Sequence, residues 1–287
     1  MDSPAVLQWY RANARDLPWR RAGFSAWGTL VSEFMLQQTQ VTRVVPILLD
    51  WLQRWPTPAD LAAVPPAEVL RAWGRLGYPR RALALHRCAT AIAEQHGNRV
   101  PEDVDELLAL PGIGDYTARA IAVFAYGHRH PVVDTNVRRV IARAELGTAQ
   151  PGAPNARRDL PAMAALLPAG RDEAAMFNAA LMEIGAVVCV AAAPRCEACP
   201  LERSCRWRAA GRPPGPASAR RQAAFAGSDR QWRGRVMAEL RASDVPVTDD
   251  ELARTVPDEA LRGRILTGLT SDGLAELGAD GWRLPGA

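Results

Sequence analysis

Lysine is absent from this chain of 287 residues, so all 35 positions counted as lysine or arginine are arginine. A bias toward arginine and alanine is typical of a GC-rich coding sequence and needs no functional explanation. The chemical consequence is more specific, because no lysine is available to form a Schiff base with an opened sugar. The N-terminal amine is the only amine nucleophile that remains, and lysine-based covalent catalysis is excluded.

Long apolar runs are also missing. The start of the chain, MDSPAVLQWYRANARDLPWRR, lacks the apolar stretch of about 7 to 15 residues that a signal peptide carries. No later segment reaches the roughly 18 apolar residues that a membrane helix needs. We therefore expect a soluble, cytoplasmic protein without a membrane partner.

The remaining composition is that of a globular protein, with 48% hydrophobic and 23% charged residues, which argues against wholesale disorder. The net charge of +4 favours a polyanionic partner, although many proteins that never bind nucleic acid share such a charge. Charge alone therefore permits a DNA-binding function without predicting one.

Apolar residues recur at helical spacing up to about residue 206, as in VSEFMLQQTQVTRVVPILLDWL, and convincing alternating strands are absent there. Proline and glycine interrupt the pattern, which predicts many short helices joined by tight turns. Residues 206–226 are rich in Arg, Pro and Ala without apolar periodicity, as is typical of a linker. We predict a mainly α-helical domain over residues 1–206, a basic linker over 207–226 and a small domain over 227–287.

The C-terminal segment predicts three helices followed by a β-hairpin. Thr248 and Glu251 form a capping-box sequence at the start of the second of these helices. A Gly-Ala-Asp-Gly turn separates two short strands near the end. Three helices and a hairpin suggest a winged-helix-like unit, and the sequence leaves open the alternative of a capping subdomain without DNA contact.

Four of the five cysteines are clustered, because Cys189, Cys196, Cys199 and Cys205 follow the spacing C-x6-C-x2-C-x5-C. Four thiolates on one compact loop are suited to wrap a 4Fe-4S cluster. Zinc is the competing interpretation, but structural zinc sites usually pair two C-x2-C knuckles, and only one occurs here. We therefore predict an iron-sulfur loop over residues 189–205.

A Gly-x-Gly turn, Gly112-Ile113-Gly114, stands just before a predicted helix in LPGIGDYTARA. Its glycines permit a tight turn and the close approach of a sugar-phosphate backbone, and the first amides of the helix are available to a phosphate. Such a turn is often only structural. Its combination with Asp134, which precedes another helix in VVDTNVRRV, and with the cysteine loop is hard to explain by chance.

The chain resembles the helix-hairpin-helix DNA glycosylases with a C-terminal iron-sulfur loop in the stretches LPWR, SEFMLQQTQV, WGRLGY, LPGIGDYTA, VVDTNVRRV and FNAALMEIGAVVC. Within them it is most similar to the adenine DNA glycosylases of the MutY type, over residues 5 to about 206. The resemblance implies a base-excision repair enzyme that hydrolyses the N-glycosidic bond of adenine mispaired with 8-oxoguanine or guanine in double-stranded DNA. The product is an abasic site, and the single-domain glycosylase pattern fits a monomer.

The resemblance assigns the chemistry to two carboxyl groups. Glu33 is the acid that protonates the adenine ring, and Asp134 stabilises the oxocarbenium sugar. Purine removal needs a neutral leaving group and a partner for a cationic sugar, so one carboxyl holds a proton while the other stays ionised. We expect apolar neighbours to raise the pKa of Glu33 and helix-start amides beside Thr135 and Asn136 to keep Asp134 charged.

The resemblance also assigns supporting residues. Tyr116 stands where bifunctional relatives carry the Schiff-base lysine, which implies a monofunctional enzyme in which Tyr116 assists near the sugar. Asn136 helps to position the attacking water, and the hairpin of Gly112, Ile113 and Gly114 holds the DNA backbone. The expected adenine pocket consists of Arg15, Leu17, Trp19, Arg20 and Glu183. The residues expected to fill the gap and contact the opposite base are Gln37, Gln38, Thr39 and Tyr78.

The chain departs from the family at two places. Pro79 follows Tyr78 where Leu-Gly-Tyr-Tyr is usual, which changes loop stiffness more than chemistry. The C-terminal segment is much shorter than the domain with which many relatives inspect oxidised guanine. Discrimination of 8-oxoguanine then depends on Gln37, Gln38 and Tyr78 or on the winged-helix-like tail.

Two other functions are kept as alternatives. One is a thymine-mismatch or oxidised-pyrimidine glycosylase of the endonuclease III type, against which Glu183, Glu33 and the absence of lysine argue. The other is a non-catalytic lesion-binding protein, which would require a broken pair of acids. Because Glu33 and Asp134 are both present, the catalytic interpretation is favoured.

Overall fold

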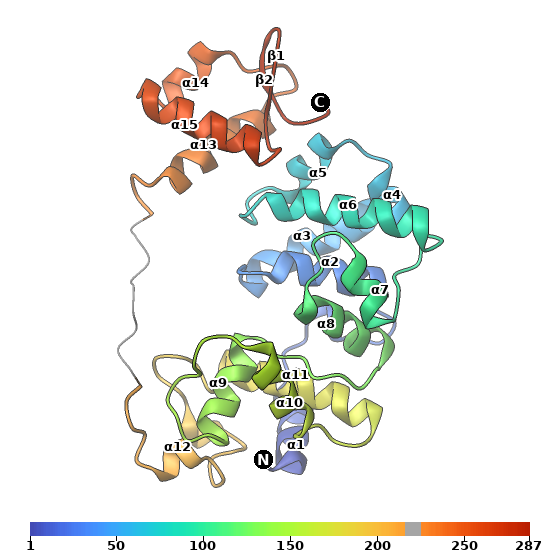
Figure 1. The fold of residues 1–287 in the computed structure, drawn as a ribbon, viewed down its shortest axis with the longest axis vertical. Helices are drawn as coiled ribbons and strands as arrows, with labels where there is room; N and C mark the ends of the chain where they lie inside the picture. The colour runs from blue at the N-terminus through green and yellow to red at the C-terminus, as the bar shows by residue number, and fades with distance from the viewer. Residues whose placement is uncertain (216–224) are drawn as a thin grey trace. The chain divides into compact units, whose positions relative to one another are not determined.

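The computed structural model describes residues 1–215 and 225–287, and most of them lie in α-helices (Figure 1). The chain divides into two compact units, each discontinuous in sequence. The first comprises Met1–Thr29, Glu102–Leu108 and Ile113–Ala219, and the second comprises Leu30–Pro101, Ala109–Gly112 and Arg220–Ala287. None of the helices that the structure describes has the length and apolar character needed to span a bilayer.

The first unit is organised around helix α11, which contacts both α1 and α9. Its helices and short 3-10 turns are α1 (Ser3–Asn13), η1 (Pro18–Arg20), α8 (Asp115–Tyr126), α9 (Thr135–Ala144), α10 (Ala156–Ala164), α11 (Arg171–Val187), η2 (Cys196–Ala198) and α12 (Arg206–Ala209). Phe177 and Ile184 of α11 are fully buried in one cluster with Val6 of α1 and Val140 of α9. Burial of such side chains contributes roughly 1.5–3 kcal/mol each and fixes α11 beside its two neighbours.

Helices α9 and α11 approach each other closely at Gly185. A Cβ atom on Gly185 would lie 2.6 Å from Cβ of Asn136 and 2.9 Å from its carbonyl oxygen. Real side chains do not tolerate such distances, so glycine is needed here. This contact brings α11 against the first turn of α9, where two of the predicted site residues lie.

We expect Gly185→Ala to destabilise the protein by about 1–3 kcal/mol, because the added methyl group has no space between two packed helices. Gly234→Ala is the matched control, because Gly234 lies within α13 (Asp229–Ala242) and no atom lies within 4 Å of an added Cβ. Alanine should stabilise that helix by about 0.5–1 kcal/mol. Denaturant unfolding measures both changes, and a Gly185→Ala protein as stable as the wild type would contradict the close approach.

The second unit has a tryptophan-rich core. Its elements are α3 (Val41–Arg54), α4 (Pro58–Ala62), α5 (Pro66–Trp73), α6 (Arg80–Gln95), α13, α14 (Asp249–Thr255), α15 (Glu259–Ser271), β1 (Glu276–Gly278) and β2 (Gly281–Arg283). Helices α2 (Ala26–Leu36) and α7 (Val104–Ala109) contain residues of both units. Trp51 makes edge-to-face contacts with Trp55 and Trp73, with ring centroids 4.7 and 5.8 Å apart. Helix α6 contacts both α4 and α5, so these three helices cover the core together.

The predicted glycine turn lies between α7 and α8, and its first glycine has a structural reason of its own. Gly112 has φ +78°, and an added Cβ would lie 2.9 Å from Cβ of Ala84 and 3.1 Å from a ring atom of Phe34. Packing against α6 and α2 therefore requires glycine at this position, in addition to any approach of DNA.

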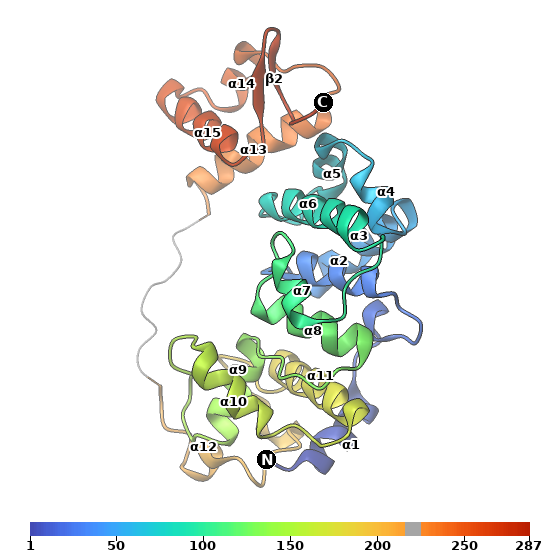
Figure 2. The same ribbon diagram turned by 45° about the vertical axis from the view of Figure 1, so that its right-hand side comes forward.

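The C-terminal subdomain, residues 225–287, contains the three helices and the hairpin that the sequence predicts (Figures 1 and 2). Strands β1 and β2 are antiparallel with Leu277 opposite Trp282, and Val247 forms an isolated bridge to Trp282. The capping box is confirmed, because the amide of Thr248 donates to Oε2 of Glu251 at 2.8 Å and the amide of Glu251 donates to Oγ1 of Thr248 at 3.3 Å.

Polar contacts join the C-terminal subdomain to α5 and α6. Nη2 of Arg71 donates to the carbonyl of Ser243 at 3.0 Å, and Arg80 pairs with Asp272 at 3.2 Å. The subdomain carries eleven acidic residues against eight arginines, whereas the whole chain has a net charge of +4. Its net charge is therefore negative, which does not favour contact with a DNA backbone.

The segment predicted as a linker is described only in part. Helix α12 occupies its start, where Trp207 is buried and donates through Nε1 to the carbonyl of Pro213 at 2.8 Å. Folded structure thus continues beyond residue 206. Residues 216–224 of the predicted linker lie outside the described residues.

Candidate active site

Asp134 is the N-cap residue of α9. Its Oδ1 accepts a hydrogen bond from the amide of Val137 at 2.7 Å, and its Oδ2 accepts one from Nδ2 of Asn136 at 2.8 Å. Burial has the larger effect and raises the pKa of Asp134, while these hydrogen bonds act in the opposite direction. The expectation that helix-start amides control the charge is therefore corrected. The amides favour the ionised form, but desolvation outweighs them.

A chain of hydrogen bonds connects this carboxylate to the cysteine loop. Asn136 donates to Asp134 as described, and it accepts through Oδ1 from Nη2 of Arg139 at 2.8 Å. Nε of Arg139 donates to the carbonyl of Cys189 at 2.7 Å. The first cysteine of the loop is thus linked to Asp134 through two side chains. Arg139 was missed by the sequence-based assignment, because nothing in the VVDTNVRRV stretch distinguishes it from its neighbour.

Glu183 is completely buried and forms the centre of an ion-pair cluster. Its Oε1 accepts from Nε of Arg15 at 2.6 Å and from the Arg15 amide at 3.2 Å. Its Oε2 accepts from Nη2 of Arg15 and from Nη2 of Arg20, both at 2.8 Å. Four donors fill the four acceptor positions of the carboxylate. Glu183 therefore orients Arg15 and Arg20 in this structure, and no acceptor position is left on it for a base.

The ion-pair cluster determines the ionisation of Glu183. Burial alone would raise the pKa of this carboxyl group, but the hydrogen bonds and charges of Arg15 and Arg20 lower it to about 2. Beside the cluster, Leu17 is buried and Trp19 is half-buried. The structure thus brings Arg15 and Arg20 together on Glu183, and Leu17 and Trp19 lie between these arginines in the sequence.

We expect Glu183→Gln to destabilise the protein by about 3 kcal/mol at neutral pH, because it leaves two arginines around a neutral buried amide. The folded-state pKa of about 2 lies below the ordinary value of 4.5. The stabilisation from the ionised carboxylate is therefore complete above the ordinary value and is lost as the pH falls toward the folded value. Thermal unfolding of both proteins from neutral to acid pH measures this, and a stability difference that stays constant down to about pH 3 would contradict the assignment.

Tyr116 lies in the first turn of α8 and is half-buried. It packs against the small apolar cluster of Ala120, Val123 and Val132, so the body of the ring is held by the first unit. Gly114 is the N-cap of α8 and provides no side-chain cap. Position 114 therefore provides no side chain to cap the first amides of α8. The predicted binding of a phosphate at these amides requires this.

Glu33 lies in α2 and belongs to the second unit, with 8% of its surface exposed. Val31, Phe34 and Met35, its neighbours in the helix, are buried as well. Glu33 is thus buried together with apolar neighbours of the same helix. Desolvation favours the neutral form of a carboxyl group, so this position is suited to a proton donor.

The residues predicted to enter the DNA stack lie on two loops of the second unit. Gln37, Gln38 and Thr39 follow α2, and Tyr78 precedes α6. Gln38 and Tyr78 have φ angles of +56° and +47°, which are uncommon for residues with a side chain. Gln38 is exposed and Tyr78 is 50% exposed. Thr39 differs from this pattern, because it is buried and donates through Oγ1 to the carbonyl of Leu76 at 3.1 Å.

Arg81, in the first turn of α6, joins these two loops and was missed by the sequence-based assignment. Its guanidinium donates to Phe34 O (2.8 Å), Met35 O (3.1 Å), Gln37 O, Thr39 Oγ1 (2.9 Å), Leu76 O (3.4 Å) and Gly77 O (3.0 Å). The same group lies 5.3 Å from the ring centroid of Trp73 and 5.5 Å from that of Tyr78. Burial lowers the pKa of Arg81 to about 10, which leaves the side chain charged at neutral pH.

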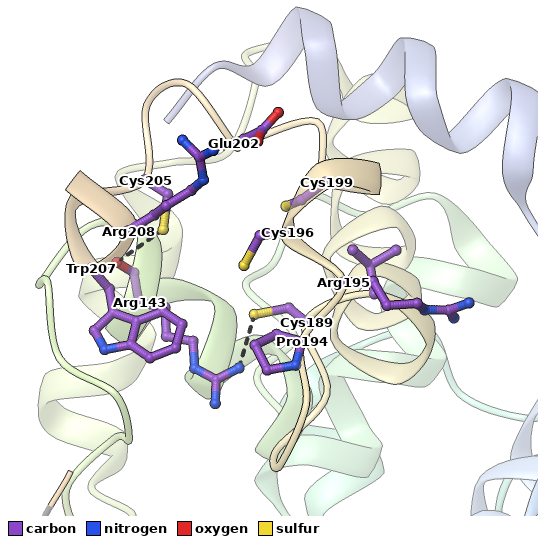
Figure 3. Close-up of a pocket in the computed structure, with 11 residues that line it drawn as sticks. Arg143, Cys189, Pro194, Arg195, Cys196, Cys199, Glu202, Cys205, Trp207 and Arg208 are labelled. Atoms are coloured by element: carbon purple, nitrogen blue, oxygen red, sulfur yellow. Dashed lines mark hydrogen bonds and ion pairs between the residues drawn. The ribbon is translucent and has the colours of Figure 1, made fainter. Parts of the chain in front are cut away.

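The four clustered cysteines line one hollow that is partly open to solvent (Figure 3). Figure 3 shows their sulfur atoms directed toward this space, with Arg143 and Trp207 at its rim. Arg143 is buried, donates to Sγ of Cys189 at 3.4 Å and lies 4.7 Å from the ring centroid of Trp207. Burial raises the pKa of Cys189, and the hydrogen bond and charge of Arg143 act in the opposite direction.

The chemistry of the four side chains bears on which metal group the cysteine loop could hold. Within residues 1–215 and 225–287, no three or more His, Cys, Asp or Glu side chains are arranged to hold one metal ion. Four thiol groups that line one hollow are a donor set of the kind that iron-sulfur clusters use.

Comparisons with known proteins agree with these observations. Residues 31–164 match the model of the HhH-GPD superfamily base excision DNA repair proteins. The chain is 57% identical over 277 residues to an adenine DNA glycosylase of Mycolicibacterium smegmatis, covering 96% of this chain and 93% of the relative. It is 54% identical over 283 residues to an adenine DNA glycosylase of Mycobacterium tuberculosis, covering 98% of this chain and 92% of the relative.

A solved structure with the same fold is named for a different substrate base, thymine. The structure of a thermostable thymine-DNA glycosylase matches with a TM-score of 0.65 at 27% identity, over 72% of this chain and 95% of the other. The predicted mainly α-helical glycosylase fold is thereby confirmed. The mycobacterial matches cover nearly the whole chain and so extend into the C-terminal subdomain.

Proposed function

The chain belongs to the adenine DNA glycosylases of the HhH-GPD superfamily, and we propose that it removes adenine mispaired with 8-oxoguanine or guanine from double-stranded DNA. The reaction is hydrolysis of the N-glycosidic bond and leaves an abasic site. The observation that carries the proposal is a pair of carboxyl groups, the buried Glu33 and the half-buried Asp134, in a chain without lysine. Both lie within the matched residues 31–164.

The two carboxyl groups have separate roles in this mechanism. Glu33 donates its proton to a ring nitrogen of adenine, which turns the base into a neutral leaving group. Asp134 faces the positive charge that develops on the sugar as the bond breaks. Because burial makes the ionised Asp134 energetically unfavourable in the free protein, a cation beside it is stabilised strongly. Asn136, bonded to Asp134, orients the attacking water, and Tyr116 assists near the sugar.

The arginine cluster recognises the flipped base. Glu183 holds Arg15 and Arg20 in place from below, so their remaining donors and Trp19 are oriented before adenine arrives. Such preorganisation lowers the entropy lost on binding. Glu183 thus acts through the two arginines and contacts the base edge only if one of them moves.

The cysteine loop holds a 4Fe-4S cluster through Cys189, Cys196, Cys199 and Cys205. The cluster, when bound, would supply a rigid link that orders this loop beside the DNA. We expect about four iron atoms per chain in the purified wild-type protein, detected by metal analysis and by visible absorption. Cys199→Ser should reduce this iron content and weaken DNA binding, whereas Cys88→Ser should leave the iron unchanged, because Cys88 is buried in α6 and does not belong to the cysteine loop. Full iron content in Cys199→Ser would contradict the ligand assignment.

Single-turnover cleavage of duplexes with adenine opposite 8-oxoguanine or guanine tests the proposed function. Each reaction is analysed with and without alkali after the enzyme step. Strand breaks at adenine that appear only after alkali support a monofunctional adenine glycosylase, and the two rates report its preference for the opposite base. Absence of adenine release from both duplexes would overturn the proposal. Release of thymine from a mismatched duplex would then favour the thymine glycosylase alternative.

A further inference from the structure

One side chain, Arg81, connects the two loops that carry the predicted stack-filling residues. Its Nη1 donates to carbonyls of Phe34, Met35 and Gln37, on the end of α2 and the loop after it. Its Nη2 donates to Thr39 Oγ1 in that loop and to carbonyls of Leu76 and Gly77 in the loop before α6. The planar guanidinium is therefore shared between two segments almost forty residues apart in sequence.

The two loops need such support because their backbones adopt unfavourable conformations. Gln38 has φ +56° and Tyr78 has φ +47°. Residues with a side chain keep these conformations only where the surrounding structure imposes them, and such positions cluster at functional sites. Both side chains are exposed, and the Arg81 guanidinium lies 5.5 Å from the Tyr78 ring centroid. Arg81 also caps the C-terminal end of α2, the helix that carries Glu33.

We propose that Arg81 is a positioning residue that holds both loops as one rigid wedge, so that Gln37, Gln38 and Tyr78 enter the duplex together when adenine leaves the stack. This inference rests on the proposed function. Arg81 does not act by contacting DNA, because its Nη donors are engaged by protein oxygen atoms. Arginine is required for this role, because the donors of its two Nη atoms point in fixed directions, whereas lysine presents one ammonium group.

Arg81→Met and Arg81→Lys test the inference when two substrates are compared. In one duplex adenine is opposite 8-oxoguanine, so a base pair must be opened and the gap filled. In the other, adenine is opposite an abasic site, so no pair has to be broken. Arg87→Met is the matched control, because Arg87 is an exposed arginine of the same helix. Thermal unfolding of each variant is measured in parallel.

We expect Arg81→Met to lower single-turnover cleavage of the paired adenine by about 100-fold, the size typical of a misplaced site. In Arg81→Met, cleavage of the adenine opposite the abasic site should fall less than about tenfold. Arg87→Met should match the wild type on both substrates. Arg81→Lys should show the same selective loss of cleavage of the paired adenine, but a smaller one. If Arg81→Met does not fold, Arg81→Lys is the variant that tests the inference.

Equal losses on the two substrates, or no loss on either, would overturn the positioning role. A general loss of structure affects both substrates alike, and only a wedge defect depends on the base pair. If the wild-type protein releases adenine from neither duplex, the proposed function itself fails. The two failures are therefore distinguishable.

Discussion

Glu33→Gln is expected to lower single-turnover adenine release by about 10²–10⁴-fold, the size typical of losing a general acid. Glutamine keeps the shape and polarity of the side chain, but it has no acidic proton to give to the adenine ring. The position is only 8% exposed, so solvent is poorly placed to supply the proton instead. DNA affinity should change little, because the charge and the size of the side chain at the site are preserved when Glu33 is neutral.

The matched control for this substitution is Glu94→Gln, because Glu94 is an exposed glutamate of α6. It should release adenine at the wild-type rate. Rates are measured with enzyme in excess over a duplex with adenine opposite 8-oxoguanine, and binding is measured separately by fluorescence anisotropy. Unchanged turnover in Glu33→Gln would rule out Glu33 as the acid and require another proton donor.

Asp134→Asn is expected to lower adenine release by about 10²–10³-fold, because the charge that faces the developing cation is lost. The same substitution should keep or raise the stability of the folded protein at neutral pH. Burial raises the pKa of Asp134, so the folded state binds this proton more tightly than the unfolded state does. The resulting stabilisation is present below the ordinary pKa and is lost as the pH rises through the folded value. At neutral pH the ionised wild-type residue therefore lowers stability, and asparagine removes this penalty.

We expect Asp134→Asn to unfold at the same temperature as the wild type or at a higher one at neutral pH, with the difference shrinking in acid. Asparagine is also a good N-cap residue, so the start of α9 keeps its capping. Asp258→Asn is the matched control, because Asp258 caps α15 in the same way, with its Oδ1 accepting from the Leu261 amide at 2.8 Å, but is exposed. Loss of stability in Asp134→Asn without loss of activity would show that Asp134 is only a helix cap.

Several features were predictable because they depend on neighbouring residues. The capping box of Thr248 and Glu251 is a local hydrogen-bond pattern, and the structure contains both of its bonds. The cysteines lie within one short loop, so their spacing alone indicated that they would meet. The N-cap position of Asp134 followed from the residues after it. Local patterns of this kind do not depend on how the rest of the chain packs.

Residues that act through distant partners could not be found in the same way. Arg15 meets Glu183 across 168 positions, and Arg81 meets Phe34 across 47. The arginine-rich composition hides such residues, because nothing in the sequence distinguishes Arg81 from the 34 other arginines. The resemblance to the glycosylases identified Glu183 but gave it a direct contact with the base, whereas the structure fills its acceptor positions with Arg15 and Arg20.

The sequence by itself determined the helical class, the absence of a lysine nucleophile and the cysteine set, because residue identity and local spacing carry this information. The two carboxyl groups were assigned from the resemblance to the glycosylases. The tertiary structure alone decided how these groups are held and charged. Burial outweighs the helix amides at Asp134, two arginines reverse the effect of burial at Glu183, and Arg81 ties together two strained loops. Desolvation and long-range hydrogen bonds depend on which surfaces meet when the chain folds, and no local pattern encodes that.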